Sequence, residues 1–128
     1  EGLAVRRAQL SCNVFLSSAN ALTLDGKIVC VDGVGNRVAA TAFGPEKVII
    51  AVGANKITKD LDDALRRIKE VAAPPTLKEL GLSLPCTETG TCQDCRSPHR
   101  GCCITMILEH RPFFTDTTII IVNESLGF

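Results

Sequence analysis

Four cysteines in one short stretch of the chain have the spacing of a metal centre. Cys86, Cys92, Cys95 and Cys102 are separated by five, two and six residues, and Cys103 follows the last of them. Four thiolates this close together can surround one ion, and both tetrahedral zinc and iron-sulfur clusters accept four cysteine ligands. We therefore expect these four cysteines to bind zinc or an iron-sulfur cluster.

The competing interpretation of the cysteines is a disulfide framework. The chain has seven cysteines, an odd number, and Cys12 and Cys30 fall in predicted strands, where a reduced cysteine packs as a small apolar residue. The basic side chains of Arg96, His99 and Arg100 lie in the same stretch and are expected to lower the pKa of the thiols, which favours thiolates. Metal or redox chemistry is therefore the favoured prediction.

A glycine-containing loop is the second feature that points to chemistry. Asp32, Gly33, Gly35, Asn36 and Arg37 lie between a predicted strand and a predicted helix. Glycines before a helix leave backbone N–H groups free to cradle an anion, and the arginine adds a charge-assisted contact. The loop lacks the third glycine of a dinucleotide-binding fingerprint and the Gly-Lys-Ser/Thr of a P-loop. We expect it to bind a small anionic group.

Polar residues also follow the predicted strands, where ligands bind in open α/β sheets. Four of the five asparagines occupy such positions: Asn20, Asn36, Asn55 beside Lys56, and Asn123 beside Glu124. Asp32 and Glu124 are the carboxylates close enough in sequence to act as catalytic acids or bases. The alternative is that these asparagines are ordinary turn residues, which tolerate left-handed backbone.

Alternating strand and helix patterns must position these residues. Short apolar runs predict strands at 14–16, 27–31, 47–53 and 117–122, and a short helix is predicted at 37–43 with Asn36 as its N-cap. The run at 47–53 is apolar on both faces, which is typical of a central parallel strand. The stretch at 104–108 is ambiguous, and residues 85–103 are expected to form an irregular loop. The pattern as a whole predicts an α/β fold with a mostly parallel sheet.

The helix predicted at 60–72 has the clearest periodicity. Its apolar residues recur at helical spacing, Asp60 is a plausible N-cap, and two prolines at 74–75 are expected to end it. On its outer face Asp62 precedes Arg66, and Asp63 precedes Arg67, by four residues, the favoured order for ion pairs along a helix. We interpret this run of charges as a solvated face.

Composition limits the class of protein. The 128 residues suit a single domain, 1–128, and 45% are hydrophobic, which is enough for a real core. The 14 basic residues balance 14 acidic ones and aromatic residues are few, which argues against a nucleic-acid partner. No apolar run reaches the roughly 20 residues of a membrane span, so we expect a cytoplasmic protein. The only methionine is Met106, so the chain is expected to be a processed or truncated product.

Several segments, spread through nearly the whole chain, resemble those of one known protein family. They lie at residues 13–26, 31–39, 43–45, 52–56, 67–74, 86–92, 94–97 and 122–128. The family that they resemble is the lactate-utilization (LUD) domain family. Family members of this kind have a further N-terminal portion, so the resemblance implies that the chain is the C-terminal part of such a domain, with a sheet incomplete at its N-terminus.

The resemblance implies a three-layer α/β sandwich, the arrangement shared with ribose-5-phosphate isomerases and CoA transferases. Residues 18–37 are similar to sugar-phosphate isomerases, which supports an anion-binding role for 32–37. The acidic residue of the isomerase motif corresponds to Asn20, whose amide cannot act as a general base.

Three hypotheses follow. The first is an accessory or redox subunit of a lactate-oxidizing system, which works with the other subunits, carries the metal loop at 85–103 and binds a small anion. The second is an enzyme of the sugar-phosphate isomerase or CoA/acyl-transferase type, in which Asp32 and Glu124 are catalytic. The third is a non-catalytic interaction module.

Overall fold

A parallel three-stranded sheet, sheet A, carries the strands that follow the expected α/β pattern. In the computed structural model, which describes residues 2–128, its strand order is β1-β4-β7. The strands are β1 (Val14–Ser17), β4 (Lys47–Gly53) and β7 (Asp116–Val122). Both neighbours of β4 run parallel to it, so the prediction of a central parallel strand at 47–53 is confirmed. The carboxyl ends of all three strands therefore meet at one edge.

A second sheet, sheet B, has four strands in the order β5-β2-β3-β6. They are β5 (Ile57–Thr58), β2 (Ala21–Thr23), β3 (Ile28–Asp32) and β6 (Ile104–Leu108). β3 pairs antiparallel with both β2 and β6, and only the short β5 is parallel to its neighbour. The turn between β2 and β3 contains Gly26 with a φ of +91°, a conformation that favours glycine. The ambiguous stretch at 104–108 is thus a strand.

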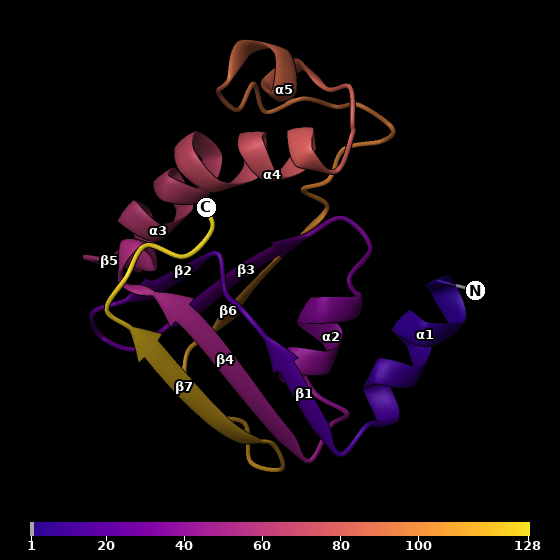
Figure 1. Ribbon diagram of the computed structural model, residues 1–128, viewed down its shortest axis with the longest axis vertical. Coiled ribbons are helices and arrows are strands. Elements are labelled where there is room, and N and C mark those ends of the chain that lie inside the picture. Colours follow the sequence, from indigo (N-terminus) through magenta and orange to yellow (C-terminus); the bar gives the residue numbers. More distant parts are fainter. Residues whose placement is uncertain (1) are drawn as a thin grey trace.

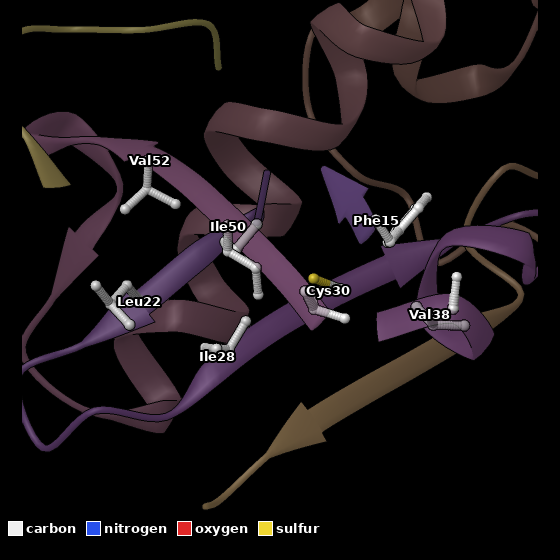
Figure 2. Close-up of a cluster of buried hydrophobic side chains, with 10 residues drawn as sticks. Phe15, Leu22, Ile28, Cys30, Val38, Ile50 and Val52 are labelled. Carbon is white, nitrogen blue, oxygen red and sulfur yellow. The ribbon is translucent and has the colours of Figure 1, made fainter. Parts of the chain in front are cut away.

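The main core lies between the two sheets. Figure 2 shows side chains from β1 to β4 and from the helix α2 (Asn36–Ala42) pointing toward one another. Val48, Ile50 and Val52 on β4 are almost fully buried, as is Cys30 on β3. The alternate residues of β4, Lys47, Ile49 and Ala51, are only partly buried. The predicted packing of Cys30 as a small apolar residue is confirmed.

A helical layer covers the other face of sheet B, which completes a three-layer α/β sandwich (Figure 1). It consists of α3 (Leu61–Arg67), the π-helical turn η3 (Ile68–Ala72) and α4 (Ala73–Glu79). Ala64 and Ile68 pack there against Ala21 and Val29 of the sheet. As predicted, Asp60 caps the first helix, where its Oδ1 accepts a hydrogen bond from the Asp63 N–H at 2.9 Å.

The prolines at 74–75 do not end this helix, contrary to the prediction. The chain passes through the π turn and starts a new α-helical segment, in which the prolines occupy its first positions. A proline costs little there because its missing N–H would have no partner in the first turn. The helix therefore continues to Glu79 before it turns toward the cysteine-rich stretch.

The remaining helices are short. They are α1 (Gly2–Ala8), η1 (Gln9–Ser11), η2 (Ala54–Lys56) and α5 (Pro85–Thr89). The loop predicted at 85–103 is irregular apart from α5, and it lies beyond α4 at one end of the molecule (Figure 1). None of the helices formed by residues 2–128 has the length and apolar character that a membrane crossing requires.

Candidate anion-binding edge and cysteine cavity

Arg37 is the centre of a hydrogen-bond network next to the carboxyl edge of sheet A. It extends from α2, and its Nε donates to Asp32 Oδ1 at 2.8 Å, while Nη2 donates to Asn20 Oδ1 at 2.7 Å. Further bonds run to the carbonyls of Val31 and Ser18. Four of the five N–H donors of this guanidinium are therefore used within the protein. Arg37 holds the segment after β1 against the end of β3.

Asp32 supports the same network from the end of β3. Its Oδ1 forms an ion pair with Arg37 at 2.8 Å, and its Oδ2 accepts the N–H of Val38 at 3.0 Å, in the first turn of α2. The side chain is only 10% exposed. Both carboxylate oxygens are thus occupied by structural contacts. The geometry gives Asp32 a positioning role, since neither oxygen is left without a protein donor.

Two other cations converge on the same segment without any carboxylate. Lys56, in η2 after β4, is 9% exposed, and its Nζ donates to Ser18 Oγ at 3.2 Å. Arg67, from the end of α3, donates through Nη1 to the carbonyl of Asn20 at 2.7 Å and through Nε to that of Asn55 at 3.0 Å. Among residues 2–128, neither Lys56 nor Arg67 forms an ion pair.

The electrostatics of these two cations follow from their position. Burial lowers the pKa of Lys56, and the nearby charges of Arg67 and Arg37 lower it further. Burial also lowers the pKa of Arg67. Three of the five Arg67 donors and two of the three Lys56 donors have no protein acceptor within the described chain. Asp32 offsets Arg37 alone, so the edge carries two uncompensated positive charges.

A cavity of about 240 Å³ adjoins this edge. Asn20, Asp32, Gly33 and Arg37 form its polar wall, and its remaining lining is mainly apolar: Val31, Ile68, Ala73, Thr76, Leu77, Leu80, Gly101 and Cys102. The Asn20 amide nitrogen donates to no group among residues 2–128. The structure thus brings five of the predicted site residues to one cavity, the predicted metal ligand Cys102 among them.

The glycine loop has a different geometry from the one expected. Gly35 is the N-cap of α2 with a φ of +94°, and the Asn36 side chain, predicted to cap this helix, instead donates to Gln9 Oε1 at 3.0 Å. A Cβ at Gly33 would lie 3.2 Å from the backbone of Gly101, so the cysteine-rich loop covers this glycine. The glycines allow two backbones to approach closely. The Val38 N–H that an external anion would use is held by Asp32.

Hydrogen bonds join the segment that follows β4 to the segment that follows β7. Asn55 Nδ2 donates to the carbonyl of Gly127 at 3.0 Å, and its Oδ1 accepts the Leu126 N–H at 3.1 Å. Asn123 and Glu124 are exposed, and Glu124 is bonded through its main chain: its carbonyl accepts the Ala54 N–H and its N–H donates to the Val122 carbonyl. Residues 124–127 thus form a C-terminal strap that lies over η2.

The four predicted metal ligands line one small cavity. Cys86, Cys92, Cys95 and Cys102 share a space of about 20 Å³ with Leu77, Leu84 and Arg100. All seven cysteines are unbridged. Within the described residues, 2–128, no three His, Cys, Asp or Glu side chains lie close enough together to hold a metal ion. The loop therefore gathers the four thiols without closing them into a coordination shell.

A comparison with protein families identifies the chain. The model of the LUD domain matches residues 1–122, which is nearly the whole sequence. The chain belongs to the LUD domain family. It is therefore a protein related to lactate utilization, and the family resemblance seen in the sequence is confirmed. Searches of curated proteins and of solved structures gave no significant match.

The cysteine cavity of this LUD domain suits a single ion better than a cluster. A space of about 20 Å³ holds roughly one water-sized body, far less than a cluster of several iron and sulfur atoms. Arg100 Nε is buried without a hydrogen-bond partner in the described chain, beside these thiols. A cationic donor left without an acceptor fits sulfur ligands that carry negative charge. The donor set is chemically that of a thiolate-bound metal ion, but among residues 2–128 the thiols do not lie close enough together to form its coordination shell.

The expected lowering of the thiol pKa values is wrong for two of the four cysteines. Burial raises the pKa of Cys86, and the neighbouring Cys92 and Cys95 raise it further. Burial also raises the pKa of Cys102, and Arg100 offsets this only in part. Desolvation and mutual repulsion between thiolates outweigh the basic residues, because those basic residues lie mostly toward solvent.

Two residues of the candidate site in this LUD domain were missed in the sequence. Arg67 was assigned to a solvated helix face, but its guanidinium turns to Asn20 and Asn55, and Asp63 pairs with Arg66 instead. Ser18 carries the hydroxyl that accepts from Lys56. The available signal was the place of Arg67 beside the apolar Ala64 and Ile68, at the border of the buried helix face.

Proposed function

We propose that this LUD domain is an accessory component of a lactate-utilization system that binds a small carboxylate at the edge of sheet A. The observation that carries the proposal is the pair of Lys56 and Arg67, two half-buried or buried cations with five free N–H donors and no carboxylate partner among residues 2–128. Cations in such surroundings are stabilised by an anion.

The size of the site favours a small ligand. The adjoining cavity of about 240 Å³ lies below the roughly 300–1,000 Å³ typical of sites for drug-sized molecules. Asn20 connects this cavity with the cations, because its carbonyl binds Arg67 and its side chain faces the cavity. A guanidinium with free donors suits the planar carboxylate of a short hydroxy or oxo acid. We infer that Arg67 and Lys56 bind the carboxylate and that Arg37, Asp32 and Asn20 position them.

Calorimetric titration tests this function. Lactate, pyruvate, acetate and inorganic phosphate are titrated separately at low ionic strength into the protein, Arg67→Gln, Lys56→Gln and the matched control Lys59→Gln. Lys59 is 84% exposed, so its loss leaves the edge unchanged. Loss of one charged hydrogen-bonding group is expected to weaken carboxylate binding by about 1.5–3 kcal/mol, roughly 10- to 150-fold. Equal binding by all four proteins, or no binding at all, contradicts the proposal.

A metal-bound loop is the second proposed feature, favoured by the shared cavity of Cys86, Cys92, Cys95 and Cys102 and by the unpartnered Arg100 Nε. The loop would close around one ion, for which zinc fits the cavity better than an iron-sulfur cluster. Bound zinc would shape the part of the loop that contacts Gly33 and would join the loop to the cavity through Cys102.

Metal analysis of anaerobically purified protein tests this second feature. One zinc per chain, lost in a Cys92→Ser, Cys95→Ser double variant and kept in Cys12→Ser, is expected. Iron with sulfide, lost in the same variant, would restore the redox-subunit hypothesis. Absence of metal from the unaltered protein would refute the metal centre and leave the anion site standing.

The isomerase or acyl-transferase alternative receives no comparable support. Asp32 has both oxygens occupied, and the Glu124 side chain is exposed and contacts no donor among residues 2–128. A general acid or base has to reach the reacting proton within hydrogen-bond distance. The geometry of these two carboxylates favours the binding function.

A further inference from the structure

Lys56 stands apart from every other charged side chain of the protein. Among residues 2–128 it is the only charged residue that is buried, at 9% exposure. Its Nζ contacts a neutral hydroxyl, Ser18 Oγ, at 3.2 Å. A lysine kept from water usually has a carboxylate partner, because an isolated ammonium is costly to bury. Burial of this amine without a carboxylate partner therefore lowers the stability of the folded protein.

The surroundings of Lys56 favour its neutral form. Burial and the cations Arg67 and Arg37 lower the pKa of its ammonium group, while only the distant Cys30 acts in the opposite direction. A desolvated lysine beside other cations is a nucleophile at pH values where an exposed lysine is protonated. The amine can therefore act as a nucleophile, which carboxylate binding alone does not require.

Arg67 is placed to orient an electrophile toward this amine. Its Nε binds the carbonyl of Asn55, the residue that precedes Lys56 in the chain. Its Nη2 has no protein partner among residues 2–128 and is not sealed from solvent. A carboxylate bound there would lie next to the lysine, and in a 2-oxo acid the electrophilic carbonyl carbon is bonded directly to the carboxylate carbon.

Access to Lys56 depends on the C-terminal strap. A Cβ placed on Gly127 would lie 3.7 Å from Lys56 Nζ, so the backbone of the strap lies close to the amine. Three hydrogen bonds hold the strap: Ala54 N–H to Glu124 O, Leu126 N–H to Asn55 Oδ1 and Asn55 Nδ2 to Gly127 O. Two of them involve Asn55, and the strap's side chains are exposed. Few contacts have to break for a ligand to reach the amine.

We propose that Lys56 forms a covalent imine with a 2-oxo acid whose carboxylate is bound by Arg67. The lone pair of the neutral Nζ attacks the carbonyl carbon, and a proton moves from nitrogen to oxygen to give a carbinolamine. Protonation of its hydroxyl and loss of water then give the iminium. The balance is one ammonium and one ketone converted to one iminium and one water, with no oxidant or reductant. Ser18 Oγ, beside Nζ, is the hydroxyl placed to relay the proton.

The inference rests on the carboxylate-binding function proposed above, since Arg67 has to hold the acid. Among small carboxylates it selects 2-oxo acids for covalent capture, while 2-hydroxy acids bind without reacting. Lactate is therefore expected to compete with pyruvate for the site but to leave no adduct.

Reductive trapping tests the imine. The protein is incubated with pyruvate and cyanoborohydride, and the modified lysine is located by mass spectrometry of its peptides. One adduct at Lys56 is expected, labelled faster than any exposed lysine, because a lowered pKa raises the neutral fraction of its amine. Lactate slows the labelling, Lys56→Arg abolishes the main adduct, and the control Lys59→Arg leaves it unchanged.

Three outcomes separate this inference from the binding function. Labelling spread evenly over exposed lysines in the unaltered protein overturns the imine, whether or not Lys56→Arg folds. Calorimetric binding of pyruvate without an adduct at Lys56 also overturns the imine but leaves the binding function intact. Failure of both pyruvate and lactate to bind overturns the two together.

Discussion

Replacing Asn20 with aspartate places a carboxylate where three cationic side chains converge. The Asn20 Oδ1 accepts hydrogen bonds from the Val31 N–H at 2.9 Å and from Arg37 Nη2 at 2.7 Å, and its carbonyl accepts from Arg67. The amide nitrogen that would be lost donates to no group among residues 2–128. Asn20→Asp therefore removes no hydrogen bond and converts a neutral acceptor into a charged one.

The size of the effect follows from these contacts. The bond from the Val31 N–H changes from a neutral pair, about 0.5–1.5 kcal/mol, to one with a charged acceptor, about 1.5–3 kcal/mol. The bond from Arg37 already has a charged donor and becomes an ion pair, so the two together gain about 2 kcal/mol. Two effects cancel part of that stabilisation. They are the desolvation of the new carboxylate and its repulsion from Asp32, which lies on the other side of the Arg37 guanidinium. We expect a net stabilisation of roughly 1 kcal/mol, or about 3–5 °C in Tm for a domain of this size.

Ligand binding should change in the opposite direction. The new negative charge offsets one of the two uncompensated cations, and like charges a few ångströms apart at a partly exposed site repel by roughly 1–3 kcal/mol. Scanning calorimetry with and without lactate measures both effects. Asn123→Asp is the control, because it makes the same change of charge at an exposed position of the same edge. A variant that is less stable than the parent, or binds lactate equally well, refutes the reasoning.

Three further substitutions probe the edge and the strap. Arg37→Met should lower the free energy of unfolding, measured by chemical denaturation, by roughly 2–4 kcal/mol, since it leaves Asp32 without its ion-pair partner. Arg37→Lys should recover only part of the loss. If Arg37→Met changes this free energy by no more than the experimental error, the ion pair with Asp32 contributes nothing to stability. Lys56→Met should raise the free energy of unfolding at neutral pH, because the lowered pKa of Lys56 means that the unfolded chain binds more protons than the folded protein. The difference in this free energy between variant and parent should shrink as the pH rises through the folded-state pKa toward about 10.4. A constant difference from pH 7 to 10 would contradict the prediction. Gly53→Ala should displace the strap, since its Cβ would lie 2.6 Å from Leu126 N and 2.7 Å from Glu124 O. We expect faster hydrogen exchange at the N–H groups of Ala54 and Leu126. Unchanged protection of these two groups would contradict the prediction.

Much of the fold could be predicted because its signals are local. The apolar run of β4 and the N-cap Asp60 specify their elements through neighbouring residues, and both were located correctly. The division of the strands into two sheets could not be predicted in the same way. It depends on the short β2, whose three buried residues carry no distinct pattern, and on its hairpin with β3.

The site was predictable where it depends on topology. Asn20, Asn55 and Lys56 follow parallel strands, and the carboxyl ends of those strands meet at one edge, so their approach follows from strand order. The hydrogen-bond partner of each side chain was harder to predict from the sequence. Asn36 was expected to cap α2, but Gly35 does so, because the left-handed conformation there needs no side chain.

Arg67 shows the physical limit of reading one helix in isolation. The sequence offers Asp63 as a partner four residues away, and a solvent-exposed pair of this kind contributes only a few tenths of a kcal/mol. Two backbone carbonyls from other segments, those of Asn20 and Asn55, hold the guanidinium more firmly. Contacts between residues 47 positions apart depend on the tertiary fold, which no local pattern contains.

The most direct test of the central claim is the side-chain resonance of Lys56 in a protein labelled with ¹⁵N-lysine, followed by NMR against pH and added lactate. If Lys56 is an unpaired cation of a carboxylate-binding edge, its Nζ titrates at a lower pH than is usual for lysine, and lactate shifts its resonance while leaving that of the exposed Lys59 unchanged. A Lys56 resonance that titrates at the pH usual for lysine and does not respond to lactate would contradict the account.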